Sequence, residues 1–471
     1  MLEQGHYILP WVRHPENPEN LSEDDRAQIR RWAQLQLPLT VRGGNWEGPL
    51  RGAAFRDLPP ADNPLTLTPD GAIDRRPSPL GPVDPWRAVG RSLTDNEAMR
   101  LLQDLYPDPP LVLFLSNNEV RTLRWHELGR SKRFLDRYGP DATDNFKRQV
   151  VADGWIVRYG ALFDAMRGGL AGGTWRRNAR FVGHDAFGPS HYGRWEGWHE
   201  YALATRDRID WNPLVWDGGS PSYYDNDWQP EKADHRVWSM QVEAMNWVFI
   251  QREALRINPA FWFEMSVWDG DTGGEGWKAG GGKVILPKPE QYRRRGQAWT
   301  PERYEGSTQF GMWLLRPRSV REFRGHGQPR EPFQAHWEAI PRAVDRVHDD
   351  ATLSRFWRAG ELVPNRSHPH PFQTDMLPRY ANEDRWFLLD TSLDPPRPWT
   401  YETELPVFAL ALVVGEPGSR TWLMYAHAPL GERKDVRVSI PGFREVTVDV
   451  PVAGAFHAVE ESTGAARRTA Q

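Results

Sequence analysis

Residues 111–119 read Leu111-Val112-Leu113-Phe114-Leu115-Ser116-Asn117-Asn118-Glu119, and this stretch decides the fold. In an apolar run of strand length, both faces of the strand carry apolar side chains. This is typical of a parallel sheet that is covered on both faces. The run stops at a group of polar residues that ends in a carboxylate. The stretch therefore predicts a buried parallel strand with Glu119 just beyond its carboxyl end.

Strands of this kind alternate with amphipathic helices through the first 350 residues. We expect further strands at 7–12, 39–41, 180–183, 213–216, 261–263 and 311–315, and an indistinct one at 86–90. We expect helices at about 22–35, 94–106, 146–166, 237–255 and 337–347. This alternation predicts a parallel sheet with helices outside it, and a (β/α)8 TIM barrel fits it best. In such barrels the chemistry lies at the carboxyl ends of the strands.

The pattern changes from about residue 386. Short strands are expected at 407–414, 421–425, 435–440, 446–450 and 455–459, separated by Gly, Pro and charged residues. Val436-Arg437-Val438-Ser439-Ile440 alternates apolar and polar residues, which is typical of an antiparallel strand with one solvated face. The sequence thus predicts a barrel domain over 1–350 with long mouth loops, a helical and Pro-rich connection over 351–384, and an antiparallel β-sandwich over 385–471.

The composition excludes several classes of function. The net charge is −4 over 471 residues and the basic residues form no stripe, so nucleic acid is not an expected partner. No apolar run approaches the roughly 18–20 residues that a membrane span needs. Cysteine is absent, which excludes thiolate catalysis and cysteine metal sites. No signal peptide is visible; a secreted or periplasmic location is still the expectation, with a cytoplasmic one as the alternative.

Tryptophan is several times more frequent than usual, with 24 residues. Its flat apolar face suits the C–H face of a sugar ring, although many of these side chains are expected to fill the core. Glu119 and Glu264 each follow a predicted buried strand, 264 − 119 = 145 residues apart. Glycosidic bond cleavage needs two carboxyl groups that flank the anomeric carbon, and this pair supplies them.

The strand ends also resemble those of a known group of enzymes. Asn118-Glu119 resembles the fourth-strand signature of clan A glycoside hydrolases, in which Asn contacts the sugar 2-hydroxyl and Glu is the general acid/base. Phe261-Trp262-Phe263-Glu264 is similar to the end of their seventh strand, where Glu is the nucleophile. The resemblance covers residues 5–345. It implies a retaining glycosidase with Glu119 and Glu264 as catalytic residues, a carbohydrate substrate, and neither cofactor nor metal.

The resemblance further implies that His184 is a polar strand-end residue, that Tyr223 or Tyr224 lies against the nucleophile, and that Trp313 is the aromatic platform under the reacting sugar. The expected substrate-binding residues are Asn118, His184, Asp217, Tyr223, Tyr224, Trp268, Trp313 and Trp46. The segment 216–228 is rich in polar and aromatic residues and is expected to be a binding loop.

Other interpretations stay open at this point. Each of the two glutamates could instead form a structural salt bridge or a helix cap, and Glu196 is the reserve carboxylate. The barrel could be a catalytically inactive carbohydrate-binding protein. A metal-dependent hydrolase that uses His184, Asp185 and Asp217 is a third alternative. The sequence contains no glycine-rich phosphate loop, HExxH or GxSxG motif, so the matching enzyme classes are not expected.

Overall fold

The structure is a computed structural model. It describes residues 11–117, 123, 125–184, 212–224, 239–268, 277–278, 284–285, 290, 293, 300–322, 333–365, 384, 386–391 and 407–469. The chain forms two compact units. The first comprises Met1–Pro189, Gly197–Pro221 and Arg252–Glu264, and the second comprises Ser190–Glu196, Ser222–Gln251 and Met265–Gln471.

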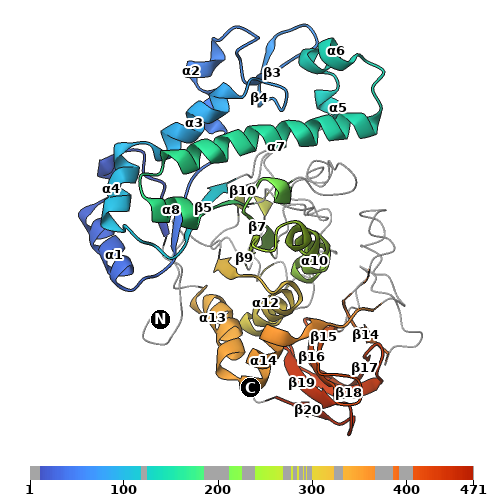
Figure 1. Cartoon of the computed structure of the whole chain (residues 1–471). Coiled ribbons are helices and arrows are strands. Elements are labelled where there is room, and N and C mark those ends of the chain that lie inside the picture. The colour runs from blue at the N-terminus through green and yellow to red at the C-terminus, as the bar shows by residue number, and fades with distance from the viewer. Residues whose placement is uncertain are drawn as a thin grey trace. The chain divides into compact units, whose positions relative to one another are not determined.

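The first unit contains the amino-terminal helices and strands (Figure 1). Its strands are β1 (Trp11–Arg13), β2 (Leu39–Arg42), β3 (Leu65–Leu67), β4 (Ile73–Pro77), β5 (Val112–Asn117), β6 (Ala179–His184) and β7 (Gly218–Ser220). Its helices are η2 (Pro18–Asn20), α1 (Glu23–Gln34), η3 (Gly48–Arg51), α2 (Ala53–Arg56), α3 (Asp84–Thr94), α4 (Glu97–Leu105), α5 (Trp125–Leu128), α6 (Lys132–Tyr138), α7 (Asp144–Gly169), α8 (Gly173–Asn178) and η4 (Asn212–Leu214). The elements α10 (Ser239–Ile257) and β9 (Trp262–Trp268) cross the boundary between the units.

The large sheet is parallel, as the sequence predicted. Parallel pairs join β1 to β2, β2 to β5, β5 to β6, β6 to β7 and β7 to β9. The full strand order is β1-β2-β5-β6-β7-β9-β12, where β12 is Ser319–Glu322, and β8 (Ser222–Tyr224) pairs with the end of β9. Over the described residues the order does not return to β1, so the sheet is open and the closed eight-stranded barrel is not confirmed.

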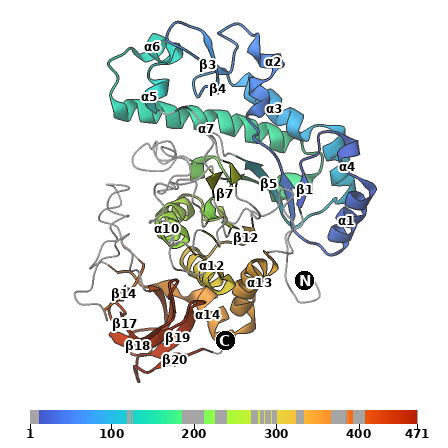
Figure 2. The same ribbon diagram turned by 180° about the vertical axis from the view of Figure 1, so that it is seen from behind.

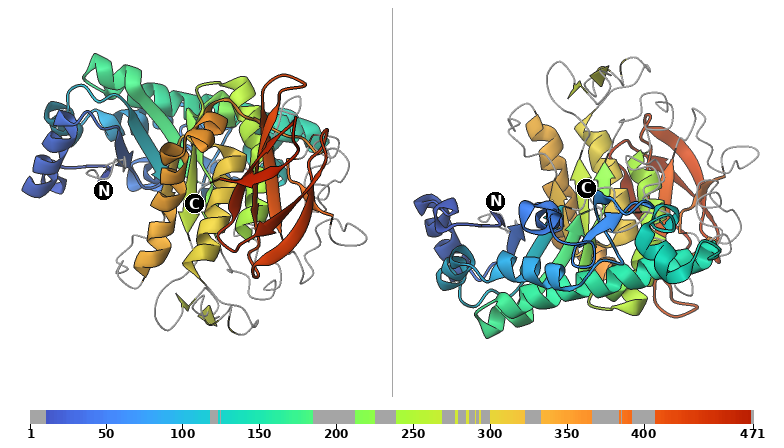
Figure 3. Two further views of the ribbon diagram at one scale, coloured as in Figure 1. Left: turned by 90° about the horizontal axis from the view of Figure 1, so that it is seen from below. Right: turned by 90° about the horizontal axis from the view of Figure 1, so that it is seen from above.

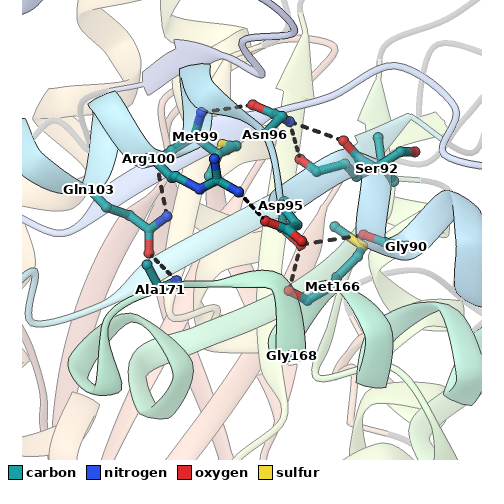
Figure 4. Close-up of polar contacts among 12 residues, drawn as sticks. Gly90, Ser92, Asp95, Asn96, Met99, Arg100, Gln103, Met166, Gly168 and Ala171 are labelled. Carbon is teal, nitrogen blue, oxygen red and sulfur yellow. Dashed lines mark hydrogen bonds and ion pairs between the residues drawn. The ribbon is translucent and has the colours of Figure 1, made fainter.

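In the first unit, α3 packs along α7, and α4 packs against α1 (Figures 1 and 2). A side chain on Gly90 of α3 would overlap the Leu162 carbonyl of α7, so the absence of a Cβ allows the two helices to approach closely. Figure 4 shows the polar contacts that link α4 to the turn after α7. There the buried Gln103 side chain accepts from Ala171 N at 2.9 Å and donates to Met99 O at 2.9 Å.

The second unit contains the carboxyl-terminal helices and strands. Its helices are α12 (Pro301–Leu315), α13 (Gln334–Asp349) and α14 (Ala351–Ala359). Its further strands are β10 (Trp277–Lys278), β11 (Val284–Ile285), β13 (Glu361–Leu362), β14 (Leu389–Asp390), β15 (Phe408–Val414), β16 (Thr421–His427), β17 (Arg433–Ser439), β18 (Glu445–Val450), β19 (Ala455–Glu460) and β20 (Ala466–Arg468). In Figure 3 the gold helix α12 lies between the orange helix α13 and the red strands.

Two antiparallel sheets end the chain, as predicted. Their strand orders are β13-β15-β16-β19-β20 and β14-β17-β18. Apolar residues of both sheets belong to one buried cluster, which includes Ala409, Trp422, Val438 and Val448. The arginine between Val436 and Val438 is exposed, in agreement with the alternation seen in the sequence. This arrangement is consistent with the expected sandwich.

Three of the predicted strands are wrong. Residues 86–90 belong to α3, which has Pro85 in its first turn, and residues 311–315 end α12, which has Thr300 as N-cap and Pro301 next. A short apolar run does not distinguish a strand from a buried helix, and the start signals of both helices decide the matter. Residues 212–214 form η4, and the strand begins only at Gly218. Within the described part of the chain, no helix is both long and apolar enough to cross a membrane.

Candidate functional site

Four polar side chains lie in one row across β5, β6, β7 and β9: three end their strands, and the fourth, Glu264, is the third residue of β9. The register pairs Asn117 with His184 and His184 with Ser220. Gly219 pairs with Phe263, so the next position along both strands places Ser220 beside Glu264. We call Asn117, His184, Ser220 and Glu264 the polar row.

The polar row lies on the inner face of the sheet. Leu115, Val182 and Trp262, each two positions earlier on their strands, pack together in a small apolar cluster. Side chains two positions apart point to the same face of a strand. Phe114 and Phe181, at the alternate positions, pack against the helices instead. The inner face therefore changes from apolar to polar within one step along several adjacent strands.

Glu264 is buried, with 3% of its surface exposed, and the fully buried hydroxyl of Ser220 lies 2.8 Å from its Oε1. An ionised carboxylate only accepts hydrogen bonds, so Ser220 donates to it. Burial of a carboxylate without partners is unfavourable, and this bond offsets part of that penalty. Strands β7 and β9 thus hold this carboxylate in a defined orientation.

His184 is connected to the same serine. Its Nδ1 lies 2.9 Å from the Ser220 carbonyl oxygen, and its side chain is buried. Because a carbonyl oxygen can only accept, Nδ1 carries the hydrogen in this contact. His184 therefore belongs to the polar row and helps to fix the main chain of Ser220. Its role in substrate binding stays a prediction.

Asn118 and Glu119 lie outside the described residues, as do Asp185 and Glu196. Asn117, the last described residue of β5, is at the far end of the polar row from Glu264. The general acid/base assignment of Glu119 stays a prediction. Tyr224 belongs to β8, and its side chain is outside the described part.

Asp217 does not lie at this end of the sheet. It precedes Gly218, and its Oδ2 accepts hydrogen bonds of 3.0 Å from both Arg167 Nη2 and Phe181 N. His184 pairs with Ser220, so about three residue steps, or roughly 10 Å, separate Asp217 from His184 along the strands. The prediction of Asp217 as a strand-end binding residue is wrong, because the strand begins after it. The alternative metal site built on His184, Asp185 and Asp217 is not supported either, because Asp217 and His184 are too far apart to bind one metal ion.

The predicted aromatic platforms are core residues. Trp46 stacks on Trp216 with ring centroids 6.0 Å apart, inside the cluster between sheet and helices. Trp313 lies on α12, packs edge-on against Trp357 and Phe456, and is fully buried. Neither ring presents a face to a ligand, so both predictions are wrong. High tryptophan content here reflects core packing at these positions.

Two further predicted aromatic contacts belong to the second unit. Tyr223 is buried, and its hydroxyl donates to Ser307 O at 3.0 Å. The expected contact of Tyr223 or Tyr224 with the nucleophile stays a prediction. Trp268 ends β9 and is 6% exposed. Its role in substrate binding stays a prediction.

Sequence reasoning missed Glu47. It follows β2 in the stretch Gly43-Gly44-Asn45-Trp46-Glu47, and Gly44 O accepts from Asn117 N at 3.2 Å, so this loop leaves the same edge of the sheet as the polar row. Glu47 is 1% exposed, and neither carboxylate oxygen has a hydrogen-bond partner among the described residues. Burial raises the pKa of Glu47 to about 7, against a smaller opposite effect of Arg51. The sequence held one signal for Glu47, namely its position shortly after a predicted strand.

Arg42 and Ser220 were missed as well. Arg42 ends β2 and pairs with Leu115, which places it one row below the polar row. Leu39 and Val41 pack against the helices, so Arg42 occupies the inner face. Across the described residues, no group of three His, Asp or Glu side chains is close enough to hold a metal ion. The site is thus built from hydrogen-bonding and charged side chains of the first unit.

Comparisons with solved structures include two distant likenesses. No family model matches the sequence, and no curated protein matches it. Among solved structures the chain is similar to a β-galactosidase from the psychrophilic Marinomonas ef1, with a TM-score of 0.40, 11% identity, and coverage of 75% of this chain and 62% of that one. It is also similar to a family 51 α-L-arabinofuranosidase from Bifidobacterium longum, with a TM-score of 0.29, 12% identity, and coverage of 89% and 81%. The chain spans less than two thirds of the galactosidase, and these values establish no family for it.

Proposed function

We propose that the chain is a retaining glycoside hydrolase that cleaves a β-linked oligo- or polysaccharide. The observation that carries the proposal is the buried Glu264 carboxylate, held by Ser220 at the end of the polar row. A parallel sheet covered by helices places its chemistry at the carboxyl ends of its strands, and Glu264 lies among those ends. A buried carboxylate in such a place is more informative than an exposed one, because it is unfavourable for stability.

In the proposed reaction, Glu264 attacks the anomeric carbon while the glycosidic C–O bond breaks. Glu119 gives its proton to the departing oxygen, and a glycosyl-enzyme ester remains. Glu119 then takes a proton from water, which attacks the anomeric carbon and releases Glu264 as a carboxylate. The assignment of Glu119 is supported by its position two residues beyond Asn117 of the polar row. His184 and Asn117 would contact sugar hydroxyl groups.

The test uses Glu264→Gln and Glu119→Gln with a panel of 4-nitrophenyl glycosides. Each variant should lose turnover by roughly 10²–10⁴-fold or more, because one removes the nucleophile that forms the ester and the other removes the group that transfers the proton. Glu97→Gln, an exposed carboxyl on α4, is the matched control and should keep full activity. The anomeric configuration of the first product, followed by NMR, should match that of the substrate.

Near-normal activity in both site variants would refute the proposal. Sugar binding without turnover by the unchanged chain would identify an inactive carbohydrate-binding protein instead. Inverted product would keep the two carboxyl groups but assign one of them to water activation.

A further inference from the structure

We infer that Ser220 is a positioning residue for the nucleophile, and that it assigns attack on the anomeric carbon to Oε2 of Glu264. The inference rests on the proposed function and deepens it. Its basis is the 2.8 Å contact between Ser220 Oγ and Glu264 Oε1, between two buried side chains on different strands of the first unit.

The main chain of Ser220 is fixed from several sides. Strand β7 lies between β6 and β9, and it pairs in parallel with both. A Cβ on Gly218 would overlap the Trp262 carbonyl of β9, so the two strands approach too closely for a side chain there. On the other side, His184 Nδ1 donates to the Ser220 carbonyl. The hydroxyl therefore starts from a rigid position.

A rigid donor fixes the orientation of the carboxylate. A hydrogen bond to an ionised oxygen is stronger than one between neutral groups, so the bond holds Oε1 in place. It also draws electron density from Oε1, which leaves Oε2 as the better nucleophile. When Oε2 forms its bond to the anomeric carbon, the glycosidic bond breaks and the departing oxygen takes the proton of the general acid. Oε1 then becomes the ester carbonyl oxygen and keeps its contact with Ser220.

The same bond assists the second half of the reaction. Hydrolysis of the ester returns negative charge to the carboxylate, and a donor already aimed at Oε1 stabilises that charge as it develops. No reorientation is needed at that moment. Ser220 thus acts through Glu264 and does not touch the substrate.

The decisive experiment compares Ser220→Ala with Ser116→Ala on the aryl glycosides that the unchanged chain hydrolyses. Ser116 is an equally buried serine at the end of β5, but its hydroxyl lies 3.3 Å from a main-chain carbonyl, that of Gly44. Loss of a hydrogen bond to a charged group should lower kcat of Ser220→Ala about 10- to 100-fold. It should also move the acid limb of the kcat/KM profile about one pH unit higher, because the charged form loses its donor.

Among the described residues, the strand register places the titratable His184 of β6 in the polar row and the guanidinium of Arg42 of β2 one row below, and both are unchanged in these variants. Ser116→Ala should show neither effect. Should Ser220→Ala fail to fold, Ser220→Cys keeps the side-chain shape with a weaker donor and should show the same shift in reduced size.

An active chain in which Ser220→Ala has the acid limb of the unchanged chain would overturn the inference and leave the proposed function standing. A chain that hydrolyses none of the glycosides refutes the proposed function, and the inference falls with it. The two failures are therefore distinguished by the unchanged chain alone.

Discussion

Glu47→Gln is expected to remove a pH-dependent loss of stability from the first unit. Glu47 is buried after the end of β2, and its two carboxylate oxygens have no hydrogen-bond partner among the described residues. Burial raises its pKa from 4.5 to about 7. The folded chain therefore retains a proton on Glu47 at pH values where the unfolded chain has released it.

The sign and the size follow from proton linkage. Between pH 4.5 and 7 the folded state binds more protons than the unfolded state, so the free energy of unfolding falls as the pH rises. The pKa difference of about 2.5 units corresponds to about 3 kcal/mol. The contribution of Glu47 is thus most favourable below pH 4.5 and is lost above pH 7. Glutamine is neutral throughout and lacks this dependence, whatever constant effect its buried amide has.

The assay is urea unfolding of both proteins at several pH values from 4.5 to 8, followed by tryptophan fluorescence. The free energy of unfolding of the unchanged chain minus that of Glu47→Gln should fall by about 3 kcal/mol across this range. Asp164→Asn, an exposed carboxyl of α7, is the control and should give a constant difference. A difference for Glu47→Gln that stays constant within about 1 kcal/mol would show that the carboxyl has a charged partner in solution, and would refute the reasoning.

Two further predictions concern buried polar groups away from the site. Gln103→Leu should lower the free energy of unfolding by about 0.5–1.5 kcal/mol in urea titrations, because the part-buried Ala171 N–H loses its hydrogen-bond acceptor. An unchanged value would contradict the contact shown in Figure 4. Burial lowers the pKa of His427 to about 3, so the free energy of unfolding should fall as the pH drops below 6.5. The total loss between pH 6.5 and 3 is up to about 5 kcal/mol, and His427→Gln should remove it from acid unfolding curves. Equal slopes would mean that this histidine is protonated in the folded chain.

Local signals were sufficient for part of the fold. The helix expected at about 22–35 forms as α1, and Ser22 caps it: its Oγ accepts from Asp25 N at 3.1 Å while Asp25 accepts from Ser22 N. The alternation from Val436 to Val438 correctly predicted a half-exposed strand. In these cases neighbouring residues determine the structure, so the sequence pattern is enough.

Elsewhere the local sequence pattern gave the wrong assignment, because it does not show which residues tertiary contacts bury. Helix α12 is buried on nearly every side, so its sequence shows no polar stripe and its last apolar residues look like a strand. The assignment of Trp313 as a platform failed for this reason. Trp46 failed differently, since a residue just beyond a strand end can turn back into the core, as its stacking on Trp216 shows. No local pattern distinguishes these positions from exposed aromatic ones.

The site was predictable only as far as single strand ends. Glu264 was identified because it follows an apolar run, although β9 continues beyond it to Trp268. The role of Ser220 depends on which residue of β7 lies beside Glu264, and that register is set by contacts far apart in the sequence. The predicted strand at 213–216 ended too early to suggest it.

The alignment of the polar row is itself an argument for a site. Apolar residues in place of Asn117, His184 and Glu264 would each stabilise the fold by roughly 1.5–3 kcal/mol through burial, so packing alone would favour them on the inner face. Instead the change from apolar to polar occurs at matched register positions on neighbouring strands. Polar side chains placed for unrelated local reasons would not fall in one row, whereas a ligand that contacts several strand ends requires it. The loop that carries Glu47 leaves from this same edge, because Gly44 O accepts from Asn117 N of the row.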